Sequence, residues 1–599
     1  MWLMLKISGF WCSSLSFALV PGLVLSTAVQ TAVAQGPAKS VAENVAAQNA
    51  LFEDYYQSGL KNSPLRATGV GDYRYNDKLD DESLAAVARE HAEADAFLAR
   101  LRAIPTTGMG DTDLLSHELL ERQIVRGDVN YELKNYEMPV NQQNGIHTEL
   151  ADLPLQVPLD SVKHYEDYIA RLHQIPRALQ QTIEVMRAGE RDHLMPPKVI
   201  VDKLPGQCDG IIAANPFLLP TKKYSLTISA VDQQRLTALI TKTVNDEVFP
   251  AYRAFAKFLR EEYDPKGREN LSIESLPDGK RRYAEAVKTM TTIDITPAQV
   301  HELGLSEVTR ITAAMTALAK AQGYPDLASF RAAINSDPKW QPTSEAQIVA
   351  DFKHYIDQME PKLPELFNLL PKAPVTVEAI PDFDAAAATH YVRGTPDGKR
   401  AGRVVVAVAD PTHRTLVLDE AVAYHEGVPG HHMQISVAQQ LKGLPNFRVR
   451  GGAYSAYTEG WALYAEELGK EIGFYQNPVS DYGRLNSELF RAVRLVVDTG
   501  IHDQGWSRDQ VIAYMHENDV NDVLAQSETD RYIAWPGQAL AYKMGQLKIR
   551  ELRERAKKEL GAKFDIKAFH DEVLNGGALP LDLLEIRVNA WIKVQAGKN

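Results

Sequence analysis

Cysteine is almost absent from this chain. Only two of its 599 residues are cysteine, Cys12 and Cys208, and Cys12 lies in the apolar N-terminal stretch. Beyond that stretch no intramolecular disulfide and no thiolate metal site can form. We expect Cys208 to be a packing residue. Stability must come from a hydrophobic core, and a chain of this length with 45% hydrophobic residues can bury a large one.

Long apolar runs are also missing, except at the N-terminus. Residues 1–34 carry one charge, Lys6, and end in Ala-Val-Ala, a small-x-small pattern typical of signal-peptide cleavage. We predict an export signal cleaved after Ala34, a periplasmic or secreted protein, and no stable membrane span after cleavage. An uncleaved membrane anchor is the alternative. The residues before Cys12 are aromatic rather than small, so a lipoprotein signal is not indicated.

An excess of basic residues is lacking as well. The chain has 65 Lys and Arg against 78 Asp and Glu, a formal net charge of −13. This balance argues against nucleic acid as a partner. No linker rich in Pro, Ser or Gly, no low-complexity tract and no repeat divides the chain, so we predict that residues 35–599 form a single domain.

Helical periodicity dominates what is present. Thr296 before Pro297 is a good helix start, an N-cap residue followed by proline at the first helical position. We predict a mainly α fold, a large helical body that is either undivided or forms two lobes across a cleft. The amphipathic runs predict helices over Val41–Gly59, Leu84–Arg102, Asp113–Leu133, Ser161–Ala188, Asp232–Glu262, Pro297–Ala321, Ser344–Leu370, Leu485–His502 and Leu540–Leu560.

The most informative stretch is residues 424–434, which read Tyr-His-Glu-Gly-Val-Pro-Gly-His-His-Met-Gln. A His-Glu pair followed by another histidine is the core of zinc hydrolase sites, with imidazole as ligand and glutamate as general base. In the standard His-Glu-x-x-His form the ligands stand at i and i+4 of one helix. Here position i+4 from His425 is Pro429, and the next histidines are His431 and His432.

A regular helix cannot bring these histidines to one ion. Position i+6 lies about 240° around the axis, and i+7 lies about 10 Å along it. Pro429 interrupts helices and Gly430 tolerates unusual dihedral angles, so we predict a local expansion of the chain here. That expansion would place His431 where an i+4 ligand normally stands. His432 is the alternative ligand, or a hydrogen-bonding neighbour of the site, or an oxyanion stabiliser.

A third ligand is needed, with the fourth position left for water. Glu459 is the best candidate, since it lies 28 positions after His431, enough for a loop and a returning helix. Glu466 and Glu467 are its rivals. We predict one Zn²⁺ held by His425, His431 and Glu459. Glu426 is then the general base that takes a proton from the attacking water, or alternatively a group that only orients the site.

These motifs resemble a known family. Residues 425–434 resemble the signature of the bacterial domain-of-unknown-function family 885 (DUF885), and Thr-Glu-Gly-Trp-Ala at 458–462 looks like the third-ligand helix of the gluzincin metallopeptidases. Residues 491–502 and 535–545 fit the same family. The similarity spans most of the mature chain and is densest from about Thr389 to Gly545. It implies a largely helical protein similar to zinc peptidases.

One segment predicts a strand, Gly-Arg-Val-Val-Val-Ala-Val-Ala at 402–409, because it is short, β-branched and bounded by Gly402 and Asp410-Pro411. It gives a short β-sheet beside the zinc helix. In gluzincins a strand at the sheet edge pairs with the extended substrate through main-chain groups. The alternative is an ordinary buried strand.

The resemblance also bears on two later stretches. Polar residues at 3–4 spacing from Arg484 to His502 form a stripe that faces either water or a polar cleft; in a cleft, His502 would donate to the substrate. By resemblance Tyr542 stabilises the oxyanion, whereas a buried packing tyrosine is the alternative. Arg531 and Lys543 are weaker candidates for holding a substrate carboxylate.

Together these observations predict an exported zinc-dependent peptidase that hydrolyses oligopeptides. Two alternatives stay open: a zinc hydrolase of a non-peptide amide or ester, and a non-catalytic helical binding protein with a vestigial metal site. The intact Glu426 argues against the last, because a site that only binds has no need of a base.

Overall fold

The structure, a computed structural model, describes residues 39–380, 388–395, 400–409, 414–451 and 454–598. The predicted signal, residues 1–34, and its alternative as a membrane anchor lie outside these ranges. Helices predominate in the described residues and one small sheet accompanies them, which confirms the mainly α fold. No helix in this part of the chain combines the length and the apolar character needed to cross a membrane.

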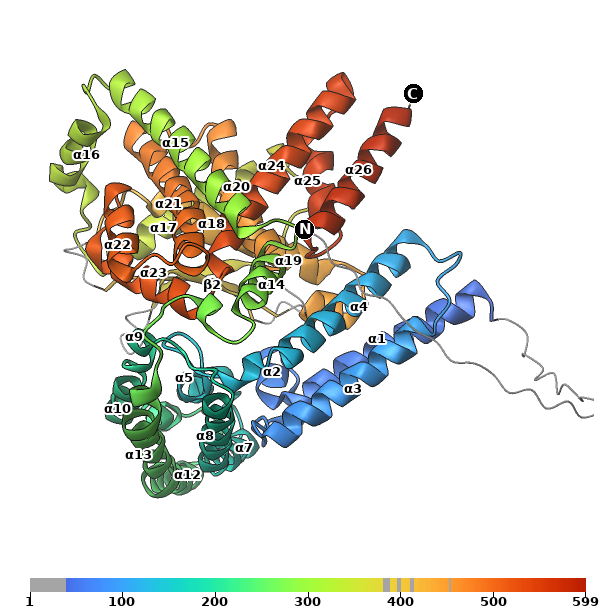
Figure 1. Ribbon diagram of the computed structural model, residues 1–599, viewed down its shortest axis with the longest axis vertical. Coiled ribbons are helices and arrows are strands. Elements are labelled where there is room, and N and C mark those ends of the chain that lie inside the picture. Colours follow the sequence, from blue (N-terminus) through green and yellow to red (C-terminus); the bar gives the residue numbers. More distant parts are fainter. Residues whose placement is uncertain (1–38, 381–387, 396–399, 410–413, 452–453, 599) are drawn as a thin grey trace, which may run out of the picture.

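The first thirteen helices form the lower part of the molecule in the view of Figure 1. Three long helices lie together at its right: α1 (Val41–Asn62), α3 (Leu84–Arg102) and α4 (Asp111–Glu132). The others are mostly shorter: α2 (Pro64–Gly69), α5 (Ile146–Ala151), α6 (Leu153–Gln156), α7 (Val162–Leu172), α8 (Ile175–Arg191), α9 (Lys198–Val201), α10 (Leu204–Ala214), α11 (Leu219–Lys222), α12 (Ala230–Thr243) and α13 (Phe249–Phe258).

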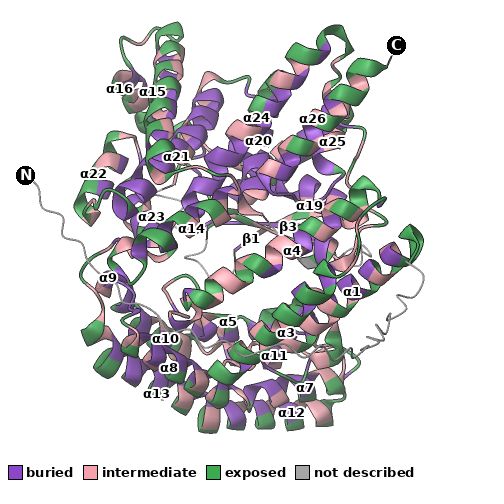
Figure 2. Ribbon diagram, turned by 45° about the vertical axis from the view of Figure 1, so that its right-hand side comes forward, coloured by how far each residue is buried: buried purple, intermediate pink, exposed green. Residues whose placement is uncertain are grey.

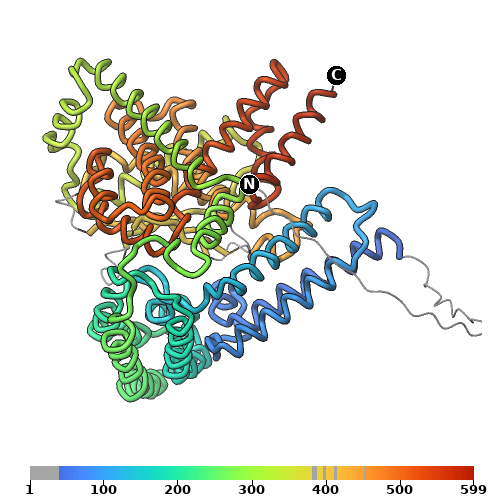
Figure 3. Tube along the Cα trace, in the orientation of Figure 1, coloured from blue at the N-terminus to red at the C-terminus, as the bar shows by residue number. Residues whose placement is uncertain are grey.

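The remaining helices form the upper part, which the chain enters after α13, as the tube in Figure 3 shows. They are α14 (Gly279–Thr291), α15 (Pro297–Ala321), α16 (Leu327–Ser336), α17 (Glu345–Met359), α18 (Asp419–Glu426), α19 (His431–Gln440), α20 (Ser455–Glu471), α21 (Pro478–His502), α22 (Arg508–Glu517), α23 (Asp522–Ala534), α24 (Ala541–Leu560), α25 (Ile566–Leu574) and α26 (Leu581–Gly597).

Most predicted helices are present, with differences at prolines. α3 and α15 coincide with their predicted ranges, and Thr296 caps α15 through a capping box with Gln299. The range predicted as one helix from 161 to 188 is two, α7 and α8, because Pro176 fits only the first turn of a new helix. The range from 232 to 262 is likewise interrupted, by π-helical turns at Val244–Val248 and Leu259–Tyr263.

The largest hydrophobic core joins the two parts of the molecule. Phe52 of α1 and Leu120 of α4 belong to the same cluster as Trp461 of α20 and Val588 of α26. All four side chains are almost fully buried. Figure 2 shows the same pattern, with α20 and α21 almost wholly buried in the upper part and α1 and α3 buried on one side only. The first and last helices of the described chain therefore stabilise a common interior. Cys208 is also buried, in a separate cluster of α5 to α13.

The sheet has three strands, β1 (Val375–Ala379), β2 (His390–Val392) and β3 (Gly402–Val406), in the order β1-β3-β2. β3 is parallel to β1 and antiparallel to β2. The predicted strand at 402–409 is therefore present but ends at Val406. It is the central strand, so its main-chain groups are paired on both sides and it cannot be the edge that receives a substrate. Among the described strands, β1 and β2 each have a neighbour on one side only.

Two glycines allow a close crossing between helices α20 and α24 in the upper part. A Cβ added at Gly460 would lie 2.3 Å from the Cα of Gly545, and one added at Gly545 would lie 1.7 Å from the carbonyl oxygen of Ala456. Neither contact is possible with a side chain present. Since Glu459 precedes Gly460, this crossing fixes the position of the predicted third ligand.

We expect Gly460→Ala to lower the free energy of unfolding by about 1–3 kcal/mol, because the added methyl group must push two backbones apart. Urea unfolding measures this. Gly127→Ala in α4 is the matched control: nothing lies within 4 Å of the added Cβ, and alanine in a helix interior should stabilise by about 0.5–1 kcal/mol. Equal stability of the wild type and Gly460→Ala would contradict the close crossing.

Candidate metal centre

The His-Glu motif straddles a complete break between two helices. α18 ends at Glu426, α19 begins at His431, and the Val428–Pro429 peptide is cis. Across the break the Gly430 N–H donates to the carbonyl of Tyr424 at 3.0 Å, a span of six residues instead of four. The predicted expansion is confirmed, although it separates two helices and is not a bulge within one.

Glycine is required at the break. A Cβ on Gly430 would lie 2.0 Å from the carbonyl oxygen of His425, so the chain folds back directly onto the turn that carries the first histidine. The indole Nε1–H of Trp461, from α20, donates to the carbonyl of Pro429 at 2.9 Å. Trp461 was not singled out from the sequence as part of the site. It ties the break to the helix that carries Glu459.

Three side chains converge on one point, namely His425 from α18, His431 from α19 and Glu459 from α20. Their ligand atoms all lie within 4.8 Å of one another. The Oε2 atom of Glu459 lies 3.5 Å from Nε2 of His425 and 3.4 Å from Nε2 of His431. Donors about 2.0–2.1 Å from a tetrahedral zinc ion lie about 3.3–3.4 Å apart. Both the donor types and the spacing therefore fit a zinc site.

His432 is not part of this group. Its Nδ1 lies 3.1 Å from the hydroxyl of Tyr391 in β2, and its Nε2 lies 3.1 Å from the carbonyl of Ala373. Both ring nitrogens thus have partners that hold α19 against the sheet. Of the two histidines left open by the sequence, the structure brings only His431 to the ligand cluster.

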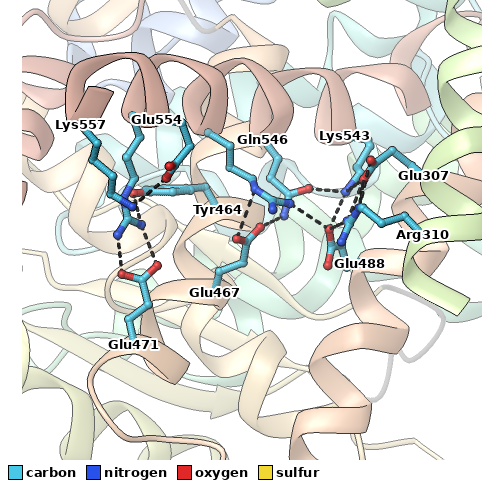
Figure 4. A network of polar contacts seen from close by, with 12 residues as sticks. Glu307, Arg310, Tyr464, Glu467, Glu471, Glu488, Lys543, Gln546, Glu554 and Lys557 are labelled. Atoms are coloured by element: carbon cyan, nitrogen blue, oxygen red, sulfur yellow. Dashed lines mark hydrogen bonds and ion pairs between the residues drawn. The ribbon is translucent and has the colours of Figure 1, made fainter. Parts of the chain in front are cut away.

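The two rivals of Glu459 have other partners. Glu466, about two helical turns further along α20, accepts a hydrogen bond at 2.8 Å from Nδ1–H of His425 and so orients this ring with Nε2 toward the centre. Glu467 belongs to the network of Figure 4, where Gln546 donates to it, while Lys543 contacts Glu488 and Glu307. Neither carboxylate competes for the ligand position.

The charges around His425 show that this site favours a cation. Burial alone would lower the pKa of His425, but hydrogen bonds to Glu459 and Glu466 and the charge of Glu426 outweigh it and raise this pKa to about 10. Burial likewise opposes ionisation of Glu459, yet the two histidines hold its pKa far below the usual range. By contrast, burial lowers the pKa of His432 to about 4, and this ring stays neutral.

Glu426 is buried beside the cluster without a committed partner. It is the last residue of α18, 8% exposed, and no described residue hydrogen-bonds its carboxylate. A buried carboxylate with no partner is costly unless something else occupies the space around it. Its position next to His425 suits a group that exchanges a proton with a molecule bound at the centre.

The C-terminal part of the polar stripe of α21 is buried against other elements of the protein. His502 is 1% exposed: its Nδ1 accepts from the N–H of Ile273 at 3.1 Å, and its Nε2–H donates to the carbonyl of Tyr532 at 2.9 Å. Burial lowers its pKa to about 3. With both ring nitrogens bound to main-chain groups, His502 cannot donate to a substrate. In this position His502 packs helices together, and these contacts argue against its predicted catalytic role, which stays a prediction.

Two further polar residues of α21, Asp498 on the stripe and Arg494 beside it, are also paired inside the protein. Asp498 accepts from the hydroxyl of Tyr283 and from the N–H of Gly537, and burial raises its pKa to about 7. Arg494 donates to Tyr532 and Glu528. Asp498, His502 and the neighbouring Arg494 therefore make internal contacts with helices and loops that are distant in the sequence.

Tyr542 lies on α24, three residues before the Gly545 crossing. Its hydroxyl accepts a hydrogen bond at 3.2 Å from Arg531, and its ring lies 4.5 Å from the guanidinium carbon of Arg494. The oxyanion role of Tyr542 stays a prediction. Lys543, its neighbour, is fully buried against Glu488 and Glu307, so it cannot anchor a substrate carboxylate.

Comparisons with known proteins agree with the motifs. The family model described as "Bacterial protein of unknown function (DUF885)" matches residues 64–588, nearly the whole described chain. The chain belongs to this family. No match is found among curated proteins.

Two solved structures are similar to this DUF885 chain. One is described as "The crystal structure of the putative lipoprotein from Colwellia psychrerythraea"; it is 31% identical, with a TM-score of 0.86, over 92% of this chain and 99% of that one. The other, described as "a putative lipoprotein of unknown function from Shewanella oneidensis", is 18% identical, with a TM-score of 0.69 over 92% and 99%. The second similarity concerns the fold alone.

The ligand assignment predicts opposite results for adjacent histidines. We expect His431→Gln to lose stoichiometric zinc after dialysis, because one of three protein ligands is gone. We expect His432→Gln to retain it, since the amide can keep the contacts with Tyr391 and Ala373. Elemental analysis of the two purified variants measures both. If His431→Gln retained zinc and His432→Gln lost it, His432 and not His431 would be the ligand.

Proposed function

We propose that this DUF885 protein is an exported zinc-dependent peptidase that cleaves oligopeptides by activated water. The observation that carries the proposal is the joint position of His425, His431 and Glu459 at the spacing of zinc donors, with Glu426 uncommitted beside them. Two imidazoles and one carboxylate are the ligand set of zinc peptidases. Export is supported by the N-terminal pattern of residues 1–34 and by the lipoprotein description of the similar structure that is 31% identical.

Each residue has a distinct task in this proposal. A bound zinc ion would supply Lewis-acid polarisation of the scissile carbonyl and increased acidity of water. Glu426 takes one proton from the attacking water while the oxygen of that water bonds to the carbonyl carbon. When the carbon–nitrogen bond breaks, Glu426 returns that proton to the leaving amine. Glu466 keeps His425 in the orientation that presents Nε2.

The sheet supports a peptide as the substrate. β2 lies near the centre, since Tyr391 of β2 contacts His432 and His432 follows the ligand His431. Its outer edge has no partner strand among the described residues. An extended peptide can add to such an edge through main-chain hydrogen bonds, which accept many side chains. β2 thus takes the role that the sequence had suggested for Gly402–Ala409.

The chemistry of the centre also permits non-peptide amides or esters as substrates, because the same groups attack any carbonyl. A digest of a mixed peptide library, followed by mass spectrometry with and without chelator, tests the proposal. We expect new cleavage products that chelator abolishes and added zinc restores. If the protein hydrolyses only non-peptide amides or esters, it is a zinc hydrolase of those substrates and not a peptidase. If it hydrolyses neither class, the binding-protein alternative is favoured.

The role of Glu426 makes a sharper prediction. We expect Glu426→Gln to lower kcat by about 10²–10⁴-fold, because the amide cannot take a proton, while zinc content stays unchanged. Steady-state kinetics and elemental analysis of one preparation measure both. Glu302→Gln, on the outer side of α15, is the control and should match the wild type. A Glu426→Gln enzyme with wild-type turnover would contradict the mechanism.

A further inference from the structure

A cavity of about 740 Å³ lies on the side of the sheet opposite the metal helix. Its walls come from α2, from the α5–α6 region, from all three strands and from Arg450 in the short helix Phe447–Gly451. This volume is in the range of ligand sites for small molecules and short peptides. The cavity therefore lies between the lower part of the molecule and the sheet.

Strand alternation connects this cavity to the metal centre. His390 and Val392 of β2 line the cavity, whereas Tyr391 between them contacts His432 on the other face. Successive side chains of a strand point to opposite faces. In β3, likewise, Arg403 lines the cavity while Val404 is fully buried. A peptide on the β2 edge would accordingly present alternate side chains to the zinc side and to the cavity.

Arginine is concentrated in the walls of this cavity. Five guanidinium groups line it, and among the described residues only Arg403 has a carboxylate partner, Glu378 of β1. The other four are exposed and without an ion pair in the described part of the chain. Elsewhere in the protein most arginines pair with carboxylates. The five are Arg66, Arg393, Arg400, Arg403 and Arg450.

The wall of the cavity opposite the arginines is acidic, and this favours some anions over others as ligands. Asp80, Glu149 and Asp152 line the cavity from the lower part of the molecule. The negative charges of these three residues would repel a dianion such as phosphate. A single carboxylate on a peptide can lie against the arginines and remain distant from the three acidic side chains. Arginine and carboxylate also match each other through two parallel hydrogen bonds.

We propose that the arginine-lined cavity binds a carboxylate of the substrate, so that the enzyme prefers peptides with an acidic side chain or a free C-terminus near the cleaved bond. This inference rests on the proposed function for its placement beside a catalytic centre. The carboxylate can come from either source, and the two are separable by experiment.

Binding can be measured without hydrolysis. The probes are heptapeptides of Ala and Leu with one Glu, their counterparts with Gln, and each of these with a free or an amidated C-terminus. Isothermal titration calorimetry with the full chain in chelator gives Kd for each. We expect the preferred carboxylate to tighten binding about tenfold, the effect of one charge-assisted hydrogen bond, and added salt to reduce this difference.

The arginines are tested by Arg393→Gln and Arg450→Gln, which should remove most of the difference between charged and neutral peptides. Arg235→Gln is the matched control: this arginine is exposed on α12 and pairs with Glu166, so the preference should persist. Both test residues are exposed, and thermal unfolding should confirm an unchanged fold.

The outcomes separate this inference from the proposed function. A preference for the side-chain carboxylate or for the C-terminal one identifies the source. Equal Kd for charged and neutral peptides, a preference unaffected by both arginine variants, or no binding of any peptide would overturn the inference. A charge preference in a protein that hydrolyses nothing would refute the peptidase while leaving the cavity as a carboxylate site.

Discussion

The reversal of the chain between α18 and α19 is the constraint on which the centre depends. His425 and His431 are six positions apart and could not share an ion on a regular helix. They meet because Gly430 folds back against the carbonyl of His425 and donates to that of Tyr424. The indole of Trp461 then fixes the break to α20, and the glycine crossing with α24 sets how closely α20 approaches.

A second constraint is electrostatic. Glu426 and Glu466 are buried and Glu459 is largely so, with only two imidazoles among them. Buried carboxylates without compensation cost several kcal/mol each. Without a metal, protonation of His425 supplies part of that compensation, which is why its pKa is raised to about 10 despite burial. A divalent cation at this point would compensate the same carboxylates with a larger charge.

Much of this centre could be predicted from the sequence, because its signals are local. Histidine spacing, the Pro-Gly pair and the Glu459 stretch lie within 35 residues, and the physical argument for a break follows from helix geometry alone. The long helices such as α15 were predictable for the same reason: their caps and apolar periods are contained in their own residues.

Other features could not be predicted, since they depend on packing between distant segments. His502 sits on a stripe typical of a polar face, but its partners are main-chain groups of Ile273 and Tyr532. Likewise the strand at 402–406 could be an edge strand, as the resemblance implied, or an ordinary buried strand, and only its pairing with both β1 and β2 makes it central. Periodicity in the sequence predicts which residues share one face of a helix or strand. Which element packs against that face depends on the whole fold and cannot be read from the periodicity.

Whether a polar group has a partner inside the protein distinguishes groups with a structural role from candidates for a functional role. In α21 and α24 nearly every buried charge has partners, such as Lys543 with Glu488 and Glu307, and such networks make the interior rigid. Around β2 the opposite holds. The carboxylate of Glu426, the Nδ1 atom of His431 and the cavity arginines other than Arg403 lack partners among the described residues. Burying a polar group without a partner costs stability; this cost applies to Glu426 and to His431, whereas water solvates the exposed arginines. The two sets lie on opposite faces of the small sheet, which is why we look for function there and not in the paired networks of α21 and α24.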